Sequence, residues 1–170
     1  MRRSDPPPPP GQGVGPGLAI APRHPQRAGP PLHITLPGEA EAVRRALQDL
    51  RTSPILQDTC DDLCSTVEII LAEVLNNIVE HAYARLSGQI TISIHHHPQS
   101  LWFEVTDTGE AMPGLSLPPG HLPAMGAVDD LPEGGFGWFL IRSLTTELRY
   151  RRIGATNRLS FRISAQQSDA

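Results

Sequence analysis

Three residues spaced four apart, Glu73, Asn77 and His81, are the first candidates for chemistry in this sequence. In a helix each step of four turns the side chain by only about 40°, so the three would form one ridge and could share a site. An asparagine oxygen can ligate Mg²⁺, and a glutamate can accept the proton of a hydroxyl group. On spacing alone, the simpler interpretation is that Glu73 and Asn77 are ordinary residues at the border of an amphipathic helix.

Two glycine-containing motifs further along the chain could approach a ligand. Asp107 and Gly109 follow an apolar run, where the chain can turn tightly and a ligand can reach the backbone. Gly134, Gly135 and Gly137 precede an apolar segment, and the free N–H groups at the start of a helix favour an anion. Each motif alone is weak, because a turn or a glycine-rich connector without a ligand explains it equally well.

The basic residues restrict how a phosphate could be held, because all 14 of them are arginines and the sequence contains no lysine. A P-loop needs its lysine beside the β- and γ-phosphates, and a eukaryotic-type protein kinase needs one on its third strand. Both designs are therefore excluded, as is lysine Schiff-base chemistry. A bound phosphate must be held by backbone N–H groups, arginine or metal.

The elements that would position these residues follow from hydrophobic periodicity. Residues 58–85 carry an apolar stripe at helical spacing and predict a long helix that presents Glu73 and Asn77. The stripe consists of Leu63, Val67, Ile70, Leu71, Val74 and Ile78. Alternating apolar residues at 90–94 and 101–105 predict a hairpin whose second strand ends near Asp107.

The rest of the folded part alternates between further periodic segments and one long loop. Residues 110–132 are rich in Gly and Pro and are longer than an ordinary connection, which is typical of a loop that closes over a site. The other predicted elements are a strand at 32–36, a helix at 40–50, a helix at 138–148, and strands at 147–152 and 157–163.

Length, composition and charge set the wider limits. We expect one domain, residues 32–165, after a disordered Pro- and Gly-rich tail formed by residues 1–31. The net charge of −4 gives no basic field for direct contact with nucleic acid. No apolar run is long enough for a signal peptide or a membrane span, which predicts a cytoplasmic protein that does not bind membranes.

The order of the motifs resembles that of the GHKL ATPases. Residues 73–83 (EVLNNIVEHAY), 107–113 (DTGEAMP) and 134–144 (GGFGWFLIRSL) resemble the N, G1 and G2 boxes of that superfamily. The closest resemblance is to the anti-sigma-factor serine kinases of bacterial sporulation and stress responses, and it covers about residues 32–163. It implies the Bergerat fold, a two-layer α/β (α+β) sandwich with helices on one face of a mixed, mainly antiparallel sheet.

The resemblance also implies roles for individual residues. Glu73 would be the general base that acts on the substrate serine, and Asn77 would ligate a Mg²⁺ ion that bridges the phosphates. Asp107 would accept a hydrogen bond from the adenine amino group, and Gly109 would let the base approach.

The glycines of the third motif, Gly135 and Gly137, would place backbone N–H groups near the phosphates. His81 and Tyr83 match the first motif, where packing is the expected role. Trp138 departs from the family pattern, which usually has leucine there, and the second motif lacks its commoner second glycine.

The implied reaction is transfer of the ATP γ-phosphoryl group to a serine of an anti-sigma-factor antagonist, with Mg²⁺ as cofactor. The protein would also bind a sigma factor, and members of the family usually act as homodimers. An alternative is a non-catalytic module of the same fold, in which nucleotide orders the 110–133 loop and thereby controls a partner surface. Glu73 argues against that alternative, because a pure binding module does not need a base. A histidine kinase domain is disfavoured because only the Pro-rich tail precedes the domain.

Overall fold

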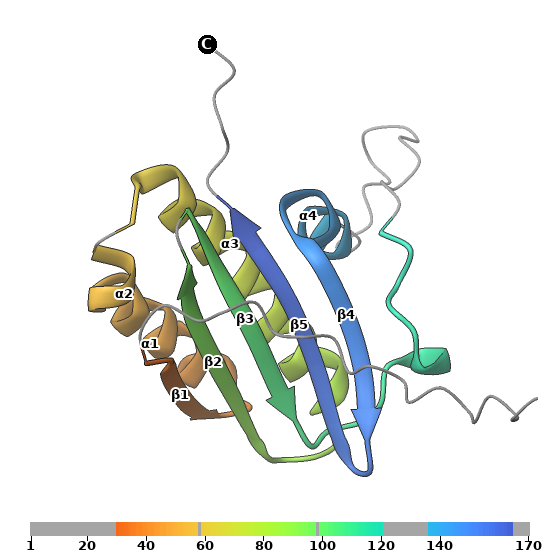
Figure 1. Cartoon of the computed structure of the whole chain (residues 1–170). Coiled ribbons are helices and arrows are strands. Elements are labelled where there is room, and N and C mark those ends of the chain that lie inside the picture. The colour runs from red at the N-terminus through yellow and green to blue at the C-terminus, as the bar shows by residue number, and fades with distance from the viewer. Residues whose placement is uncertain (1–29, 58, 98, 121–135, 165–170) are drawn as a thin grey trace, which may run out of the picture.

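The protein folds into a five-stranded sheet with its helices packed against one face (Figure 1). The computed structural model describes residues 30–57, 59–97, 99–120 and 136–164. The strands are β1 (Leu32–Pro37), β2 (Gln89–His97), β3 (Ser100–Asp107), β4 (Thr146–Ile153) and β5 (Thr156–Ser164). They lie in the order β1-β2-β3-β5-β4, and all four pairings are antiparallel.

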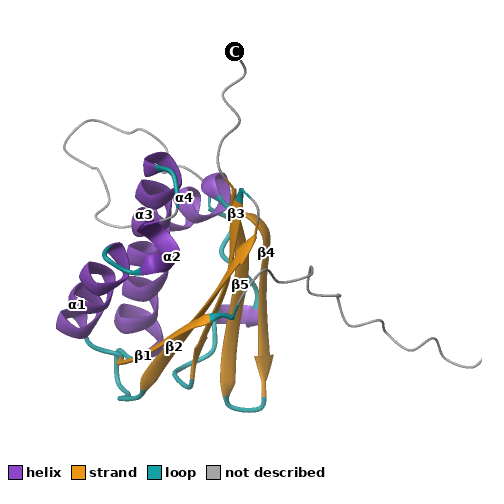
Figure 2. Ribbon diagram, turned by 60° about the vertical axis from the view of Figure 1, so that its left-hand side comes forward, coloured by secondary structure: helices purple, strands orange, loops and turns teal. Residues whose placement is uncertain are grey.

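The helices form the second layer, on one side of the sheet in Figure 2. They are α1 (Ala40–Arg51), α2 (Pro54–Gln57), α3 (Asp61–Asn77), the π-helix η1 (Ile78–Ala82), the 3₁₀ turn η2 (Pro113–Leu115) and α4 (Phe136–Leu144). The two-layer α+β fold class is confirmed. The resemblance implies a mixed, mainly antiparallel sheet, and every pairing among the described strands is antiparallel.

Helix α3 lies at the centre of the helical layer and contacts both α1 and α4. All six residues of the predicted apolar stripe are buried, and Val67, Ile70 and Leu71 are fully so. The stripe meets the inner face of the sheet, where Phe103 of β3 and Phe161 of β5 stack with their ring centroids 5.0 Å apart. This packing positions α3 above the sheet.

The long predicted helix at 58–85 is divided in the structure. Helix α3 begins only at Asp61, with Cys60 in an extended conformation before it, and α-helical geometry ends at Asn77. The chain then continues as a π-helix, in which the N–H of Tyr83 donates to the carbonyl of Ile78 at 2.9 Å. Because π-turns insert one extra residue, they re-aim the side chains that follow and often occur at functional sites.

The predicted helix at 138–148 is wrong at its C-terminal end. Helix α4 ends at Leu144, and strand β4 begins at Thr146. Pairing of Thr146 with Arg162 of β5 takes these residues into the sheet, and an irregularity between Thr146 and Arg149 accommodates a positive φ at Glu147. Tertiary pairing therefore outweighs the local helical pattern.

Tyr83 is a buried side chain at which three connections meet. A Cβ atom at Gly38 or at Gly88 would overlap the Tyr83 ring, so both connections pass directly against it. Its hydroxyl donates to the carbonyl of Gln89 at 2.8 Å and accepts from the N–H of Thr108 at 3.1 Å. The packing role predicted for Tyr83 agrees with these contacts.

Within the described ranges, no helix is long and apolar enough to cross a bilayer. The predictions for tail residues 1–29 and for loop residues 121–132 concern parts of the chain outside the described residues.

Candidate functional site

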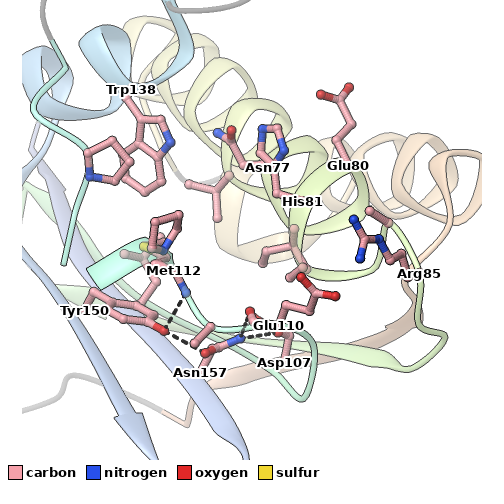
Figure 3. Close-up of a pocket in the computed structure, with 18 residues that line it drawn as sticks. Asn77, Glu80, His81, Arg85, Asp107, Glu110, Met112, Trp138, Tyr150 and Asn157 are labelled. Carbon is pink, nitrogen blue, oxygen red and sulfur yellow. Dashed lines mark hydrogen bonds between the residues drawn. The ribbon is translucent and has the colours of Figure 1, made fainter. Parts of the chain in front are cut away.

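A cavity of about 560 Å³ opens between the helical layer and the sheet (Figure 3). The end of α3 and η1 form one side, and the turn after β3 and strands β4 and β5 form the other. Trp138 of α4 closes one end, and Asp107 lies toward the other. Of the site residues predicted from the sequence, Asn77 and Asp107 line the cavity. A largely apolar cavity with a few convergent polar groups is the usual form of a small-molecule site.

Asp107 is the last residue of β3 and is only 5% exposed. Its Oδ1 accepts hydrogen bonds from Asn157 Nδ2 at 2.7 Å and from the N–H of Gly109 at 2.8 Å. Burial raises the pKa of the Asp107 carboxyl, and the hydrogen bonds from Asn157 and Gly109 and the charge of Arg152 oppose that rise. Asp107 is therefore a buried acceptor whose charge depends on its hydrogen-bond donors.

Gly109 lies against the end of η1 rather than on the cavity wall. A Cβ atom at this position would lie 2.5 Å from the carbonyl oxygen of Ala82, and the adjacent N–H of Glu110 donates to that same oxygen at 2.8 Å. The glycine is thus needed for the close contact between the turn and the helix end. Gly109 is expected to let the adenine base approach. In the structure it can do so at most indirectly, by setting the position of this turn.

Asn157 is a site residue whose role the sequence analysis missed. It lies opposite Asp107 in the β3–β5 register and is 5% exposed. Its side chain also accepts hydrogen bonds from the hydroxyl of Tyr150 and from Arg152, each at 2.7 Å. Strand alternation could have identified this residue. Asn157 lies two positions before the buried Leu159 in the same strand, so its side chain must also face inward.

Asn77 ends α3 with its amide oriented by the helix itself. Nδ2 donates to the carbonyl oxygen of Glu73, one turn earlier, at 2.7 Å. Since a carbonyl oxygen can only accept, the amide oxygen Oδ1 must be the atom left for other partners, and Asn77 lines the cavity. A hard oxygen donor presented in this way suits Mg²⁺, which takes few protein ligands and keeps several waters.

Glu73 is half-buried one turn before Asn77 and does not line the cavity. Gly137, near the start of α4, lies against its carboxylate, and a Cβ atom at 137 would overlap Oε2. That same Cβ would lie 3.6 Å from Nδ2 of Asn77. The structure therefore brings together Glu73, Asn77 and Gly137, whereas Gly135 lies outside the described residues.

The remaining members of the predicted motifs frame the cavity. His81 is exposed and lines the cavity from η1, and Trp138 lines it from α4. Within the described ranges, no group of three or more His, Cys, Asp and Glu side chains could hold a metal ion by itself.

Comparison with known proteins agrees with this geometry. The sequence profile of the histidine kinase-like ATPase domain matches residues 35–163. The chain is 30% identical over 125 residues to the serine-protein kinase RsbW of Halalkalibacterium halodurans. This alignment covers 71% of this chain and 75% of that protein. It is 32% identical over 91 residues to the RsbW of a Bacillus cereus strain, covering 52% of this chain and 56% of the relative.

A solved structure gives the same fold. The crystal structure of the RsbU and RsbW domains of Rv1364c from Mycobacterium tuberculosis matches with a TM-score of 0.51 at 18% identity, over 80% of this chain and 32% of that chain. The resemblance to the GHKL kinases is thus confirmed by profile and by sequence identity, and the fold by structure. The chain belongs to the histidine kinase-like ATPase domain family, and within it to the RsbW serine-protein kinases.

Proposed function

We propose that this kinase transfers the γ-phosphoryl group of ATP to a serine of an anti-sigma-factor antagonist and regulates a sigma factor by binding it. The observation that carries the proposal is one cavity with a buried acceptor, Asp107, toward one end and the free amide oxygen of Asn77 on its wall. Glu73 lies one turn from Asn77. The proposal extends to action in the cytoplasm as a homodimer.

Adenine recognition is assigned to Asp107. Both hydrogen bonds that it accepts from the described part of the chain go to Oδ1, which leaves Oδ2 for a ligand. An ionised carboxylate only accepts, so it pairs with the amino group of adenine and repels the carbonyl oxygen that guanine carries at the same position. The apolar wall of the cavity supports the faces of the base.

The phosphates are assigned to the end of the cavity near Asn77 and the start of α4. Oδ1 of Asn77 would hold a Mg²⁺ ion, which when bound neutralises charge on the phosphates. The fixed amide of Asn77 keeps that oxygen in place before the nucleotide arrives. Gly137, and with it Gly135, would let the phosphates come close to the backbone, because neither residue carries a side chain.

Glu73 is assigned the role of general base. The serine hydroxyl oxygen attacks the γ-phosphorus, the bond from that phosphorus to the β–γ bridging oxygen breaks, and ADP leaves. The proton of the hydroxyl passes to the Glu73 carboxylate, a step that contributes about 10²–10⁴-fold to the rate. Most of the remaining acceleration comes from positioning and charge neutralisation.

The test is phosphorylation of a partner. The protein is incubated with Mg²⁺, ATP labelled at the γ-phosphate and candidate antagonist proteins encoded beside its gene. The proposal predicts label on a serine of one antagonist and none on bovine serum albumin. If the protein binds ATP but none of these antagonists becomes labelled, the proposed reaction is contradicted and the protein acts as a nucleotide-binding module.

A further inference from the structure

Asn157 is the centre of a hydrogen-bond network at the Asp107 end of the cavity (Figure 3). Its Nδ2 donates to Oδ1 of Asp107 at 2.7 Å and to the carbonyl of Glu110 at 2.9 Å. Its Oδ1 accepts from the hydroxyl of Tyr150 and from Nη1 of Arg152, each at 2.7 Å. Every polar atom of this amide is therefore in use.

The donors on β4 fix which way the amide points. The Tyr150 hydroxyl accepts from the N–H of Met112 at 3.1 Å, so its own hydrogen is free to point at Asn157. Arg152 has donors only. With two donors on that side, the amide oxygen must face them and the amide nitrogen must face Asp107. The reverse orientation would set oxygen against carboxylate and nitrogen against two donors.

The fixed orientation determines what Asp107 can offer a ligand. The hydrogen bond from the Asn157 N–H favours the ionised form of the Asp107 carboxyl, which presents an acceptor. Burial works in the other direction and raises the pKa of Asp107, and the Asn157 hydrogen bond is first among the effects that oppose it. Without that bond the protonated carboxyl would become more populated, and a protonated carboxyl can donate to an oxygen on the base.

We propose that Asn157, held by Tyr150 and Arg152, is the positioning residue that makes this cavity select adenine over 6-oxopurines. It acts through Asp107, by keeping an N–H on Oδ1 so that Oδ2 accepts. The inference rests on the proposed function, because it assumes that a purine nucleotide occupies this cavity.

Other charged groups near Asp107 could influence the same selection. Arg152 from β4 lowers the pKa of Asp107, and Glu110 of the following turn lines the cavity beside it. Glu80, His81 and Arg85 line the cavity from η1 and from the segment after it. They remain unchanged in the experiment, so any altered selectivity is due to the network itself.

The experiment compares affinities for ATP and inosine triphosphate, which differ at position 6 of the purine. Dissociation constants are measured by calorimetry with Mg²⁺ at pH 8 and pH 6, for the full chain and for Asn157→Leu and Tyr150→Phe. We expect Asn157→Leu to lower the ATP preference by about tenfold or more, since a buried charged acceptor loses its partner, and Tyr150→Phe to lower it by about threefold. For Asn157→Leu the loss is greater at pH 6, because protonation of Asp107 is what changes the selection.

The control is Ser93→Ala, which removes a hydroxyl that pairs with His33 across strands β1 and β2, neither of which lines the cavity. It is expected to leave the ATP preference unchanged. An unchanged preference in Asn157→Leu, or in Tyr150→Phe should the first variant not fold, overturns the inference. Failure of the unmodified protein to bind either nucleotide instead overturns the proposed function, so the two failures are distinguishable.

Discussion

Gly137 of α4 lies directly against the carboxylate of Glu73 on α3, with no room for a side chain between them. A Cβ atom at the same position would also lie 3.6 Å from Nδ2 of Asn77, so this backbone position is close to both residues assigned to phosphoryl transfer. The position of the Glu73 carboxylate therefore depends on the absence of a Cβ atom at residue 137.

Replacement of Gly137 by alanine tests this contact. Alanine favours a helix over glycine by about 1 kcal/mol, so the helix itself is not weakened. The new methyl group must displace Glu73 or move α4, and we expect phosphoryl transfer to fall by about 10²-fold because a small misplacement has that effect. The measurement is kcat for antagonist phosphorylation. Ser143→Ala, at an exposed position of the same helix, is the control and should leave kcat unchanged.

Glu73→Gln separates binding from chemistry. The amide keeps the size of the side chain but cannot accept the serine proton, so transfer should fall by about 10²–10⁴-fold. The dissociation constant for ATP should change little, because Glu73 does not line the cavity. Glu68→Gln on the same helix, which removes an ion pair with Arg51, is the matched control. Near-normal transfer by Glu73→Gln would remove this residue from the role of base.

Asn77→Ala should remove most of the effect of magnesium on ATP binding. In the unmodified protein the ion is expected to tighten binding through Oδ1, so chelation with EDTA should weaken it by about tenfold or more. The variant should bind ATP with nearly the same affinity in Mg²⁺ and in EDTA. Calorimetry in both buffers checks this, with the adjacent exposed Asn76→Ala as control. An equal response to EDTA in both variants would exclude Asn77 as a ligand.

The affinity for ATP should decrease in mild acid because of Asp107. Burial raises the pKa of this carboxyl above its ordinary value of 3.8, so the folded protein binds the proton more tightly than the unfolded chain does. The protonated form, which carries a hydrogen on one oxygen and is a weaker acceptor for the adenine amino group, therefore appears at a higher pH than in an ordinary aspartate. By the same linkage, Asp107 stabilises the nucleotide-free fold more as the pH falls through its raised pKa.

Titration of ATP affinity between pH 8 and pH 4 measures this effect. Asp107→Asn should weaken binding at every pH and flatten the profile. Asp49→Asn, an exposed aspartate on α1, should retain both the affinity and the slope. A pH profile of Asp107→Asn that matches the unmodified protein would show that another group causes the decrease.

Much of the framework could be predicted from periodicity. The stripe from Leu63 to Ile78 predicts which face of α3 is buried, because burial on a helix follows its 3.6-residue repeat. Alternation in β2 and β3 predicts the hairpin and places Asp107 at its end. These patterns are local, so a single sequence contains them in full.

The sequence predictions fail where contacts between residues distant in sequence determine the local structure. The π-helix after Asn77 and the end of α4 at Leu144 depend on packing that no local pattern encodes. The partners of Asn157 come from β4, from the end of β3 and from the turn after it, up to 50 residues away in sequence. Its inward phase was visible, but a buried asparagine can have many partners, and only the strand register identifies Asp107 as one of them.

Three connecting segments contact the phenol of Tyr83. They are the segment before α1, the segment before β2 and the turn that begins at Thr108. These three connections cannot vary independently, since a shift in any one of them moves the aromatic ring that the other two rest on. An insertion near Gly38, at the far edge of the sheet, would therefore shift the turn at the purine end of the cavity. Sequence change in this corner of the molecule is constrained as a unit.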